Sequence, residues 1–326
     1  MAAINLQKWI ALIGISCLVS SFADARQQTN DNVPGDPYQL GPGSETVDPV
    51  YESVLDPFEA NSNKQRPTGI PISLTGMWMT DSDSGLATSS FSLKLPILKI
   101  FGTPPPIVKT GFTYTDLFAA TDLGLPNNLY EYSIGVSIVK PINDRWVIRS
   151  ILGVAFSTDN ENTSSDAWQF RGGAFGVYRA NERWQWSIGA IALGRSDIPV
   201  VPAIGAVWTP NSYTRWDLIP PNPKVNFLIA DVEDRQHWIY VGGGFNGTTW
   251  GYESTIFGDD TLTYSDLRLV TGWRSTPRSP VNAPFVRGRK NFVEFGYSFS
   301  RDLEFNDELT TISLDDAFLF RLGTEY

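Results

Sequence analysis

The sequence has almost no cysteine and histidine, and these two absences exclude several classes of site. Cys17 is the only cysteine and His237 the only histidine in 326 residues. Because Cys17 lies in an N-terminal apolar stretch, the chain beyond that stretch has no thiol for catalysis, a disulfide or a metal centre. A single imidazole also excludes histidine-cluster metal sites, and we interpret His237 as an ordinary residue near the start of a strand. We therefore expect no enzyme, and no catalytic, cofactor-binding or metal-binding residues.

The chain is also poor in charge, and its charge has the wrong sign for a nucleic-acid partner. Charged residues make up 18% of the sequence, whereas soluble domains average about a quarter. The net charge of −10 excludes the basic surface that phosphate backbones require. Aromatic residues, in contrast, reach 13%. Few charges and many aromatics favour a β-protein with an apolar outer surface.

An apolar run long enough to cross a membrane as a helix is missing from the N-terminal region. The stretch from Trp9 to Ser20 follows Lys8 and is shorter than the about 20 residues that a transmembrane helix needs. With the small-x-small pattern of Ala23-Asp24-Ala25, it is typical of a cleavable secretory signal. We expect residues 1–25 to be a signal peptide cut after Ala25. Lipidation at Cys17 is the less favoured alternative, because Gly14 stands where a larger apolar residue is required.

Two further regions follow the signal. Residues 26–66 are rich in Asp, Glu, Asn, Pro and Gly without a sustained apolar period, a composition that buries too little surface to fold. We expect a disordered acidic periplasmic linker there that is only a flexible tail, and a periplasmic tether or a plug is the less favoured alternative. Residues 67–326 instead alternate apolar and polar positions. Tyr130, Tyr132 and Ile134 alternate with Glu131 and Ser133 in this way, and period two indicates strands.

The strands are too long for an ordinary soluble sheet. The alternating segments 128–140, 145–157, 167–179 and 184–194 reach the about 9–11 residues that membrane-spanning strands need. Asn143-Asp144-Arg145-Trp146 and Asn181-Glu182-Arg183-Trp184 open two of them 38 residues apart, which predicts one hairpin per repeat. The fold class is thus all-β, a transmembrane antiparallel up-and-down β-barrel of about 14 strands, with 12 as the alternative.

The strand count depends on the proline-rich region between Arg195 and Lys224. Six prolines fall in it, and proline is confined to strand edges and bulges. We expect one strand in this region, which closes the barrel at 14 and makes residues 274–289 a long periplasmic connection. Asn246-Gly247 predicts a further hairpin turn.

The C-terminal segment has the pattern of a barrel-targeting strand. Phe318, Phe320, Leu322, Thr324 and Tyr326 alternate with Leu319, Arg321, Gly323 and Glu325. This segment resembles the last strand of outer-membrane barrels, which ends in Phe or Tyr. The resemblance implies the outer-membrane barrel assembly machinery as a partner for Phe318 to Tyr326, and membrane lipid as the surroundings. The oligomeric state stays open.

Charged residues within the strands predict which face is internal. Arg or Lys facing lipid at mid-depth costs about 2–4 kcal/mol, so these residues should point into the barrel. The pore-lining candidates are Glu131, Arg149, Arg171, Asp266, Arg268, Glu294 and Arg321. Such charges either line a watery pore or pair across the lumen and close it, and composition does not decide between these.

Three other motifs are interpreted as structural. Gly242, Gly244 and Gly247 match G-x-G-x-x-G, but a strand continues after them where a dinucleotide site needs a helix. We expect these glycines to relieve crowding or bend the barrel wall. The acidic clusters Asp159-Asn160-Glu161 and Asp259-Asp260 lack the spacing of a calcium loop, and we expect solvated loop charge.

The segments Gly194–Pro210 and Pro220–Val225 carry a family resemblance. Their sequences, GRSDIPVVPAIGAVWTP and PPNPKV, resemble an uncharacterised family of bacterial outer-membrane β-barrel proteins. The resemblance implies a barrel in the outer membrane and brings no substrate or catalytic residue. We expect a passive channel or transport-associated pore for small solutes. The alternative is a closed structural or adhesion barrel that presents its loops.

Overall fold

The computed structural model describes residues 72–80, 86–96, 106–117, 125–194, 200–232, 235–254, 258–278, 289–305 and 311–325. The predicted signal peptide, the predicted linker and Tyr326 lie outside the described residues. Within the described part, no helix is long and apolar enough to cross a membrane.

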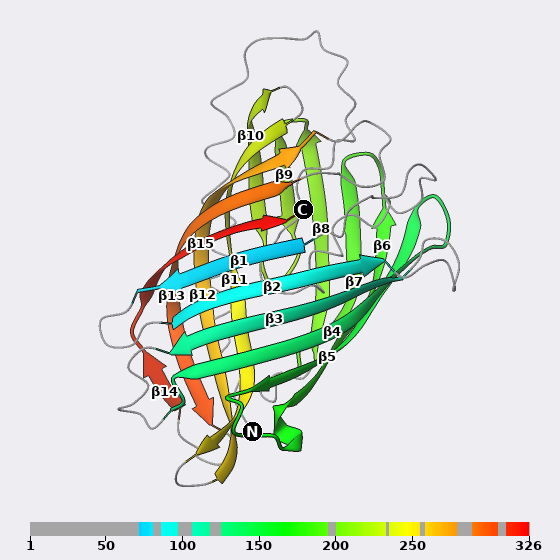
Figure 1. Ribbon diagram of the computed structural model, residues 1–326. Helices are drawn as coiled ribbons and strands as arrows, with labels where there is room; N and C mark the ends of the chain where they lie inside the picture. Colours follow the sequence, from blue (N-terminus) through cyan, green and yellow to red (C-terminus); the bar gives the residue numbers. More distant parts are fainter. Residues whose placement is uncertain are drawn as a thin grey trace. The chain divides into compact units, whose positions relative to one another are not determined.

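The alternating segments form one antiparallel sheet (Figure 1). Its strands are β1 Ile72–Met79, β2 Leu86–Pro96, β3 Ile107–Leu117, β4 Asn128–Pro141, β5 Trp146–Thr158, β6 Trp168–Arg179, β7 Trp184–Ala192, β8 Val201–Asn211, β9 Thr214–Leu218, β10 Lys224–Val232, β11 Arg235–Ser254, β12 Gly258–Pro277, β13 Lys290–Phe305, β14 Thr311–Leu314 and β15 Ala317–Glu325, and a 3-10 turn, η5, spans Ser165–Ala167. The four segments predicted as long strands are β4, β5, β6 and β7.

The sheet closes on itself. The first described strand, β1, pairs with β15 from Ser73↔Glu325 to Met79↔Leu319, and Figure 1 shows β15 beside β1. Strand β14 extends the β13 ladder beyond β15 and has no second neighbour in the strand order. The closed ring of described strands is therefore β1 to β13 and β15, which confirms the predicted 14-stranded barrel. Among the 14 described strands of the ring, closure leaves no edge strand, as a strand-built membrane protein requires.

The two rims of the barrel differ in their connections. At the terminal rim, where β1 begins and β15 ends, the turns 142–145, 180–183 and 212–213 are short. At the opposite, distal rim, the described connection 159–167 is longer. Strand β13 begins at the terminal rim, because Lys290 pairs with Glu325.

The repeated Asn motif forms the same turn twice. Asn143 Oδ1 accepts hydrogen bonds from the backbone N–H groups of Arg145 and Trp146, each at 2.9 Å. Asn181 Oδ1 accepts from Arg183 N at 2.9 Å and from Trp184 N at 3.0 Å. Asn side chains favour such turns because their short amide reaches the backbone two or three residues on. The 38-residue repeat is therefore a repeat of hairpins.

Two sequence expectations are wrong. Between Arg195 and Lys224 the structure has two strands, β8 and β9, where one was expected. The two pair with each other only from Ala206 onward, and the part of β8 before Ala206 pairs with β7. Pro202 thus lies where β8 has a ladder partner, β7, on one side only, and its missing N–H is tolerated.

Asn246-Gly247 is also not a turn. Both residues are paired inside the β11–β12 ladder, which continues to Ser254↔Gly258. Gly258, with φ +78°, begins β12 after the hairpin connection. Register with the long partner strand therefore overrides the local turn signal.

The outer face of the barrel is apolar and has aromatic residues near both rims. On β5 the outward residues include Ile148 and Leu152, 45% and 66% exposed. The ring centres of Trp146 and Tyr178 lie 4.9 Å apart at the terminal rim, and those of Phe156 and Trp168 lie 5.0 Å apart at the distal rim. The ten residue-to-residue steps from Trp146 to Phe156 span about 34 Å of strand, or roughly 24 Å at a tilt of about 45°. This distance matches the apolar band of a membrane barrel, about 25 Å tall.

Candidate functional site

The inner wall of the barrel carries all seven residues predicted to line a pore. On β5, Arg149 is 9% exposed and lies on the buried face with Val147 and Ile151. The other six are also buried or half-buried, on the faces opposite the exposed apolar residues: Glu131 and Arg171 (side chains 14% and 18% exposed), Arg268 (side chain 9%), Asp266, Glu294 and Arg321. The structure gathers six of them into three separate groups of contacts.

Glu131 and Arg171 form a bidentate ion pair that spans the inner face of β5. Arg171 Nη1 donates to Glu131 Oε1 at 3.0 Å and Arg171 Nη2 to Oε2 at 2.7 Å. Nη2 also donates to Gln169 Oε1 at 2.7 Å. Bidentate guanidinium–carboxylate geometry is the strong form of this interaction. The pair therefore ties β4 to β6 on the inside of the barrel.

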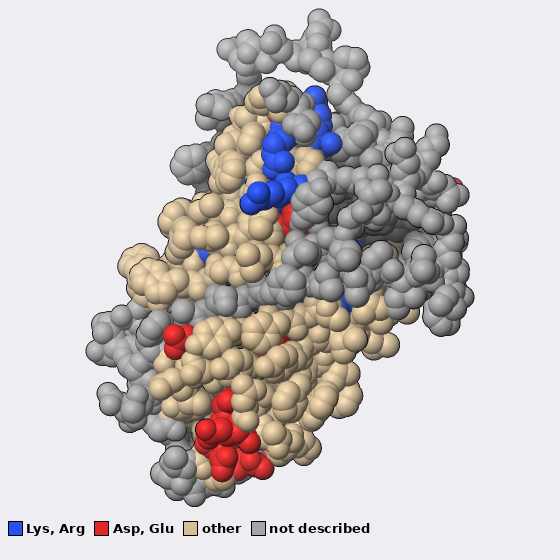
Figure 2. Space-filling model, in the orientation of Figure 1, with Lys and Arg blue, Asp and Glu red and all other residues tan. Residues whose placement is uncertain are grey.

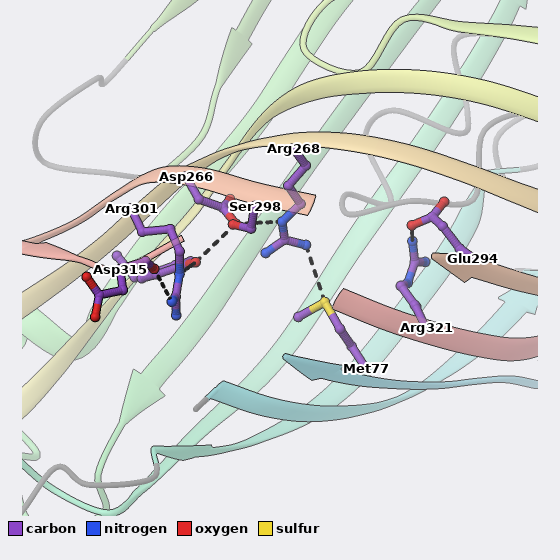
Figure 3. A network of polar contacts seen from close by, with 9 residues as sticks. Met77, Asp266, Arg268, Glu294, Ser298, Arg301, Asp315 and Arg321 are labelled. Atoms are coloured by element: carbon purple, nitrogen blue, oxygen red, sulfur yellow. Dashed lines mark hydrogen bonds and ion pairs between the residues drawn. The ribbon is translucent and has the colours of Figure 1, made fainter. Parts of the chain in front are cut away.

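Asp266 is the centre of the second group (Figure 3). Its Oδ2 accepts from Arg268 Nε at 2.7 Å, from Ser298 Oγ at 2.5 Å and from Tyr264 Oη at 3.0 Å. Arg268 Nη1 also lies 3.3 Å from Met77 Sδ on β1. The network continues through Tyr264 to Arg301, whose Nε lies 3.1 Å from Tyr264 Oη.

Glu294 is the centre of the third group, nearer the terminal rim. Tyr240 Oη donates to Glu294 Oε2 at 2.9 Å. Lys224 Nζ lies 3.4 Å from Oε2, and Arg321 Nη1 lies 3.5 Å from Oε1. Tyr240 reaches the carboxylate by crossing β12 at Gly272, where a Cβ would lie 2.5 Å from Tyr240 Oη. A glycine is thus required at this position for the close approach.

Sequence reasoning missed several internal charges. Arg215 and Asp217 form a buried pair with Nε 2.7 Å from Oδ1, and Asn226 Nδ2 donates to Asp217 Oδ2 at 2.8 Å. Lys224, Arg274 and Arg301 are also buried. All lie in strands, so the rule that strand charges face inward would have found them. Arg215, Asp217 and Lys224 were missed because only one strand was predicted in the proline-rich region.

A junction crosses the barrel at the distal rim. Gly251 of β11 pairs in parallel with Thr158 of β5, and Asp159 N donates to Gly251 O at 3.2 Å. Asp159 Oδ2 accepts from Glu253 N at 2.9 Å. Asn162 Nδ2 donates to Tyr252 O at 3.1 Å. This cross-barrel junction joins two strands that are not neighbours in the ring.

Apolar packing accompanies the junction. A buried cluster brings together Leu129 of β4, Trp250 of β11, and residues of β1, β12, β13 and β15. A second cluster on β5 to β8 contains Ile151, Phe175 and Val207, with Ile219 packed over Gly205. The interior therefore combines polar groups with apolar surfaces.

The remaining motifs are structural or lie at the junction. The glycines of G-x-G-x-x-G lie inside β11, and Asn222 approaches Gly244 so closely that a Cβ there would lie 2.0 Å from Asn222 Oδ1. The expectation of solvated charge is wrong for Asp260, which is 2% exposed, because the hairpin folds onto the 159–167 loop. Among the described residues, no group of three or more His, Cys, Asp and Glu could hold a metal ion. His237 stacks on Trp273.

Residues 108–227 match a family model described as "Domain of unknown function (DUF6268)". The matched range contains the segments Gly194–Pro210 and Pro220–Val225, and the match confirms the resemblance to an uncharacterised family. No curated protein matches the chain.

Solved barrels of outer membranes are similar in topology at low identity. The NanC porin is 8% identical with a TM-score of 0.36, over 78% of this chain and 98% of that chain. The β domain of the Bordetella autotransporter BrkA is 10% identical with a TM-score of 0.36, over 79% and 98%. An outer membrane channel from Pseudomonas putida F1 is 11% identical with a TM-score of 0.36, over 82% and 98%.

Proposed function

We propose that the protein is an outer-membrane barrel that conducts small solutes and has no enzymatic activity. The charged inner wall carries this proposal. A barrel needed only as a scaffold gains nothing from buried ions, because desolvating each one costs several kcal/mol. Ionisable residues inside membrane-spanning segments typically mark solute or ion pathways. Glu131, Asp266 and Glu294, each held by guanidinium or ammonium groups, fit such a pathway.

The proposed route to the membrane follows from the ends of the chain. A signal peptide of residues 1–25 is cut after Ala25, and residues 26–66 form a periplasmic linker. The barrel assembly machinery binds the strand from Phe318 to Tyr326, whose outward Phe318 and Leu322 are 67% and 49% exposed. The terminal rim, with its short turns, faces the periplasm.

A closed structural or adhesion barrel is the second candidate, and the cross-barrel junction favours it. Hydrogen bonds from Asp159 and Asn162 to β11 hold the distal mouth narrow. In that case the loops of the distal rim would be the functional surface, and the internal charges would only brace the wall.

Single-channel recording on the refolded mature chain in planar bilayers separates the two. Stepwise ion-conducting openings support the channel, and a chain that folds but never conducts supports the closed barrel. Folding is checked by heat-modifiable migration on gels, since a closed barrel migrates differently before and after boiling. Fractionation as a soluble periplasmic protein would reject the membrane barrel itself.

A further inference from the structure

The Glu294 group lies on one continuous row of the inner wall. Tyr240, Gly272, Glu294 and Arg321 are successive partners across β11, β12, β13 and β15. Lys224 enters from β10 and places its ammonium 4.6 Å from the centre of the Tyr240 ring. The guanidinium of Arg274 lies 5.5 Å from the centre of the same ring. Five neighbouring strands therefore contribute to one patch.

Positive charge exceeds negative charge in this patch. Lys224, Arg274 and Arg321 are 3%, 1% and 6% exposed, and Glu294 is 2% exposed. The four residues thus have a formal charge of +2, although the whole chain has a net charge of −10. In a wall of low dielectric such an excess acts on a passing ion more strongly than the same charges in water. Passages lined by one sign of charge concentrate ions of the opposite sign.

At the surrounding rim, in contrast, two basic side chains are paired with carboxylates. Arg278 Nη2 lies 2.8 Å from Asp231 Oδ2, and Lys290 Nζ lies 3.5 Å from Glu325 Oε2. Figure 2 shows Lys and Arg gathered at one end of the visible face, and Asp and Glu gathered at the other. A solute that enters or leaves at the terminal rim passes these ion pairs and then meets the Glu294 patch, where positive charge is in excess.

We propose that the patch of Lys224, Arg274, Glu294 and Arg321 makes the lumen selective for anions. This inference rests on the proposed channel function. Tyr240 and Glu294 position Lys224 and Arg321 on the wall, and the cations attract the permeating anion. Small carboxylates and inorganic anions are the solute class that such a patch favours.

Reversal potentials in a KCl gradient across a planar bilayer test the proposal. The wild-type channel should pass chloride more readily than potassium. Lys224→Gln and Arg321→Gln should each lower the chloride-to-potassium permeability ratio about sevenfold, because one unit charge roughly 7 Å away through a water-like dielectric changes the energies of the two ions by about RT in opposite directions. Glu294→Gln should raise the ratio, because it removes the only carboxylate among the four residues.

Arg278→Gln is the matched control. It removes one positive charge at the same rim from an exposed pair with Asp231, and it should leave the ratio within experimental error. Each variant is first checked for heat-modifiable migration. A potassium-selective wild-type channel, or an unchanged ratio in conducting Lys224→Gln and Arg321→Gln channels, would overturn the selectivity proposal alone. A folded wild-type barrel without conductance would instead overturn the channel function on which it rests.

Discussion

Gly251 and Thr158 pair as neighbours although their strands, β11 and β5, are six places apart around the barrel. The contact is possible because the β11–β12 ladder extends well beyond β10, which ends its pairing with β11 at Gly242. Beyond Gly242, β11 continues in the ladder with β12, and near its end Gly251 meets the end of β5. The distal rim is therefore braced from wall to wall.

Widening the junction should make openings larger or more frequent. A Cβ at Gly251 would lie 3.0 Å from both the Cα and the N of Ala167, so Gly251→Val forces the hairpin away from η5. Overpacking of this kind costs about 1–3 kcal/mol. Single-channel recording measures the outcome. Gly76→Ala is the control, because nothing lies within 4 Å of its added Cβ; an unchanged Gly251→Val channel would show that the junction does not limit flow.

The two Asn turns should contribute to stability by similar amounts. Asn143→Ala and Asn181→Ala each remove an acceptor of two backbone hydrogen bonds. We expect each to lower the free energy of unfolding by about 1 kcal/mol, measured by denaturant titration in detergent. Asp144→Ala leaves both hydrogen bonds of its turn in place and should have almost no effect. Equal losses for Asp144→Ala and Asn143→Ala would contradict the assigned role.

The Glu131–Arg171 pair should behave as a coupled unit. Removing one partner leaves the other charge half-buried without its bidentate contact, at a cost of about 1.5–3 kcal/mol. We expect Glu131→Gln/Arg171→Met to be more stable than the sum of the single effects predicts. Denaturant titration of the full double-mutant cycle gives the coupling free energy. Strict additivity would mean that the pair is not bound in the folded barrel.

The alternating strands allow much of the inner wall to be predicted from sequence. Glu131 and Glu294 lie in segments whose period of two is uninterrupted, and the segment of Arg149 is interrupted only by Ser150. Their inward direction therefore follows from the cost of charge in lipid. Arg301 illustrates the limit. Ser300 has φ +49°. Before it the buried residues of β13 have even numbers, and after it Arg301 and Leu303 are buried, so the strand turns its other set of alternate residues inward.

Contacts between strands that are distant in the sequence cannot be predicted from the alternation of apolar and polar residues. The contact of Lys224 with Glu294 joins β10 to β13, and it depends on Gly272 leaving space for Tyr240. The cross-barrel junction depends on the unequal lengths of β10 and β11. Periodicity describes the faces of one strand, whereas these features depend on how distant strands are registered.

A charged side chain on the outer face in the middle of β5 should lower the stability of the barrel in lipid. Leu152 is 66% exposed and lies between the aromatic residues of the two rims. Leu152→Arg should destabilise the barrel in lipid by about 2–4 kcal/mol, measured by refolding into vesicles. Leu152→Ala is the control for the lost side chain, and a similar loss for both variants would argue against lipid contact at this position.

The seam between β1 and β15 has a consequence for the order of assembly. Every other pair of neighbouring strands in the ring is close in the sequence, whereas Ser73 and Glu325 come from opposite ends of it. The ring cannot be completed until the last strand has been delivered. Until then β1 and the C-terminal strand each present a row of unpaired backbone groups, and in a bilayer both rows must be shielded together. The closing step is therefore a single docking event between the earliest-made and latest-made strands of the barrel.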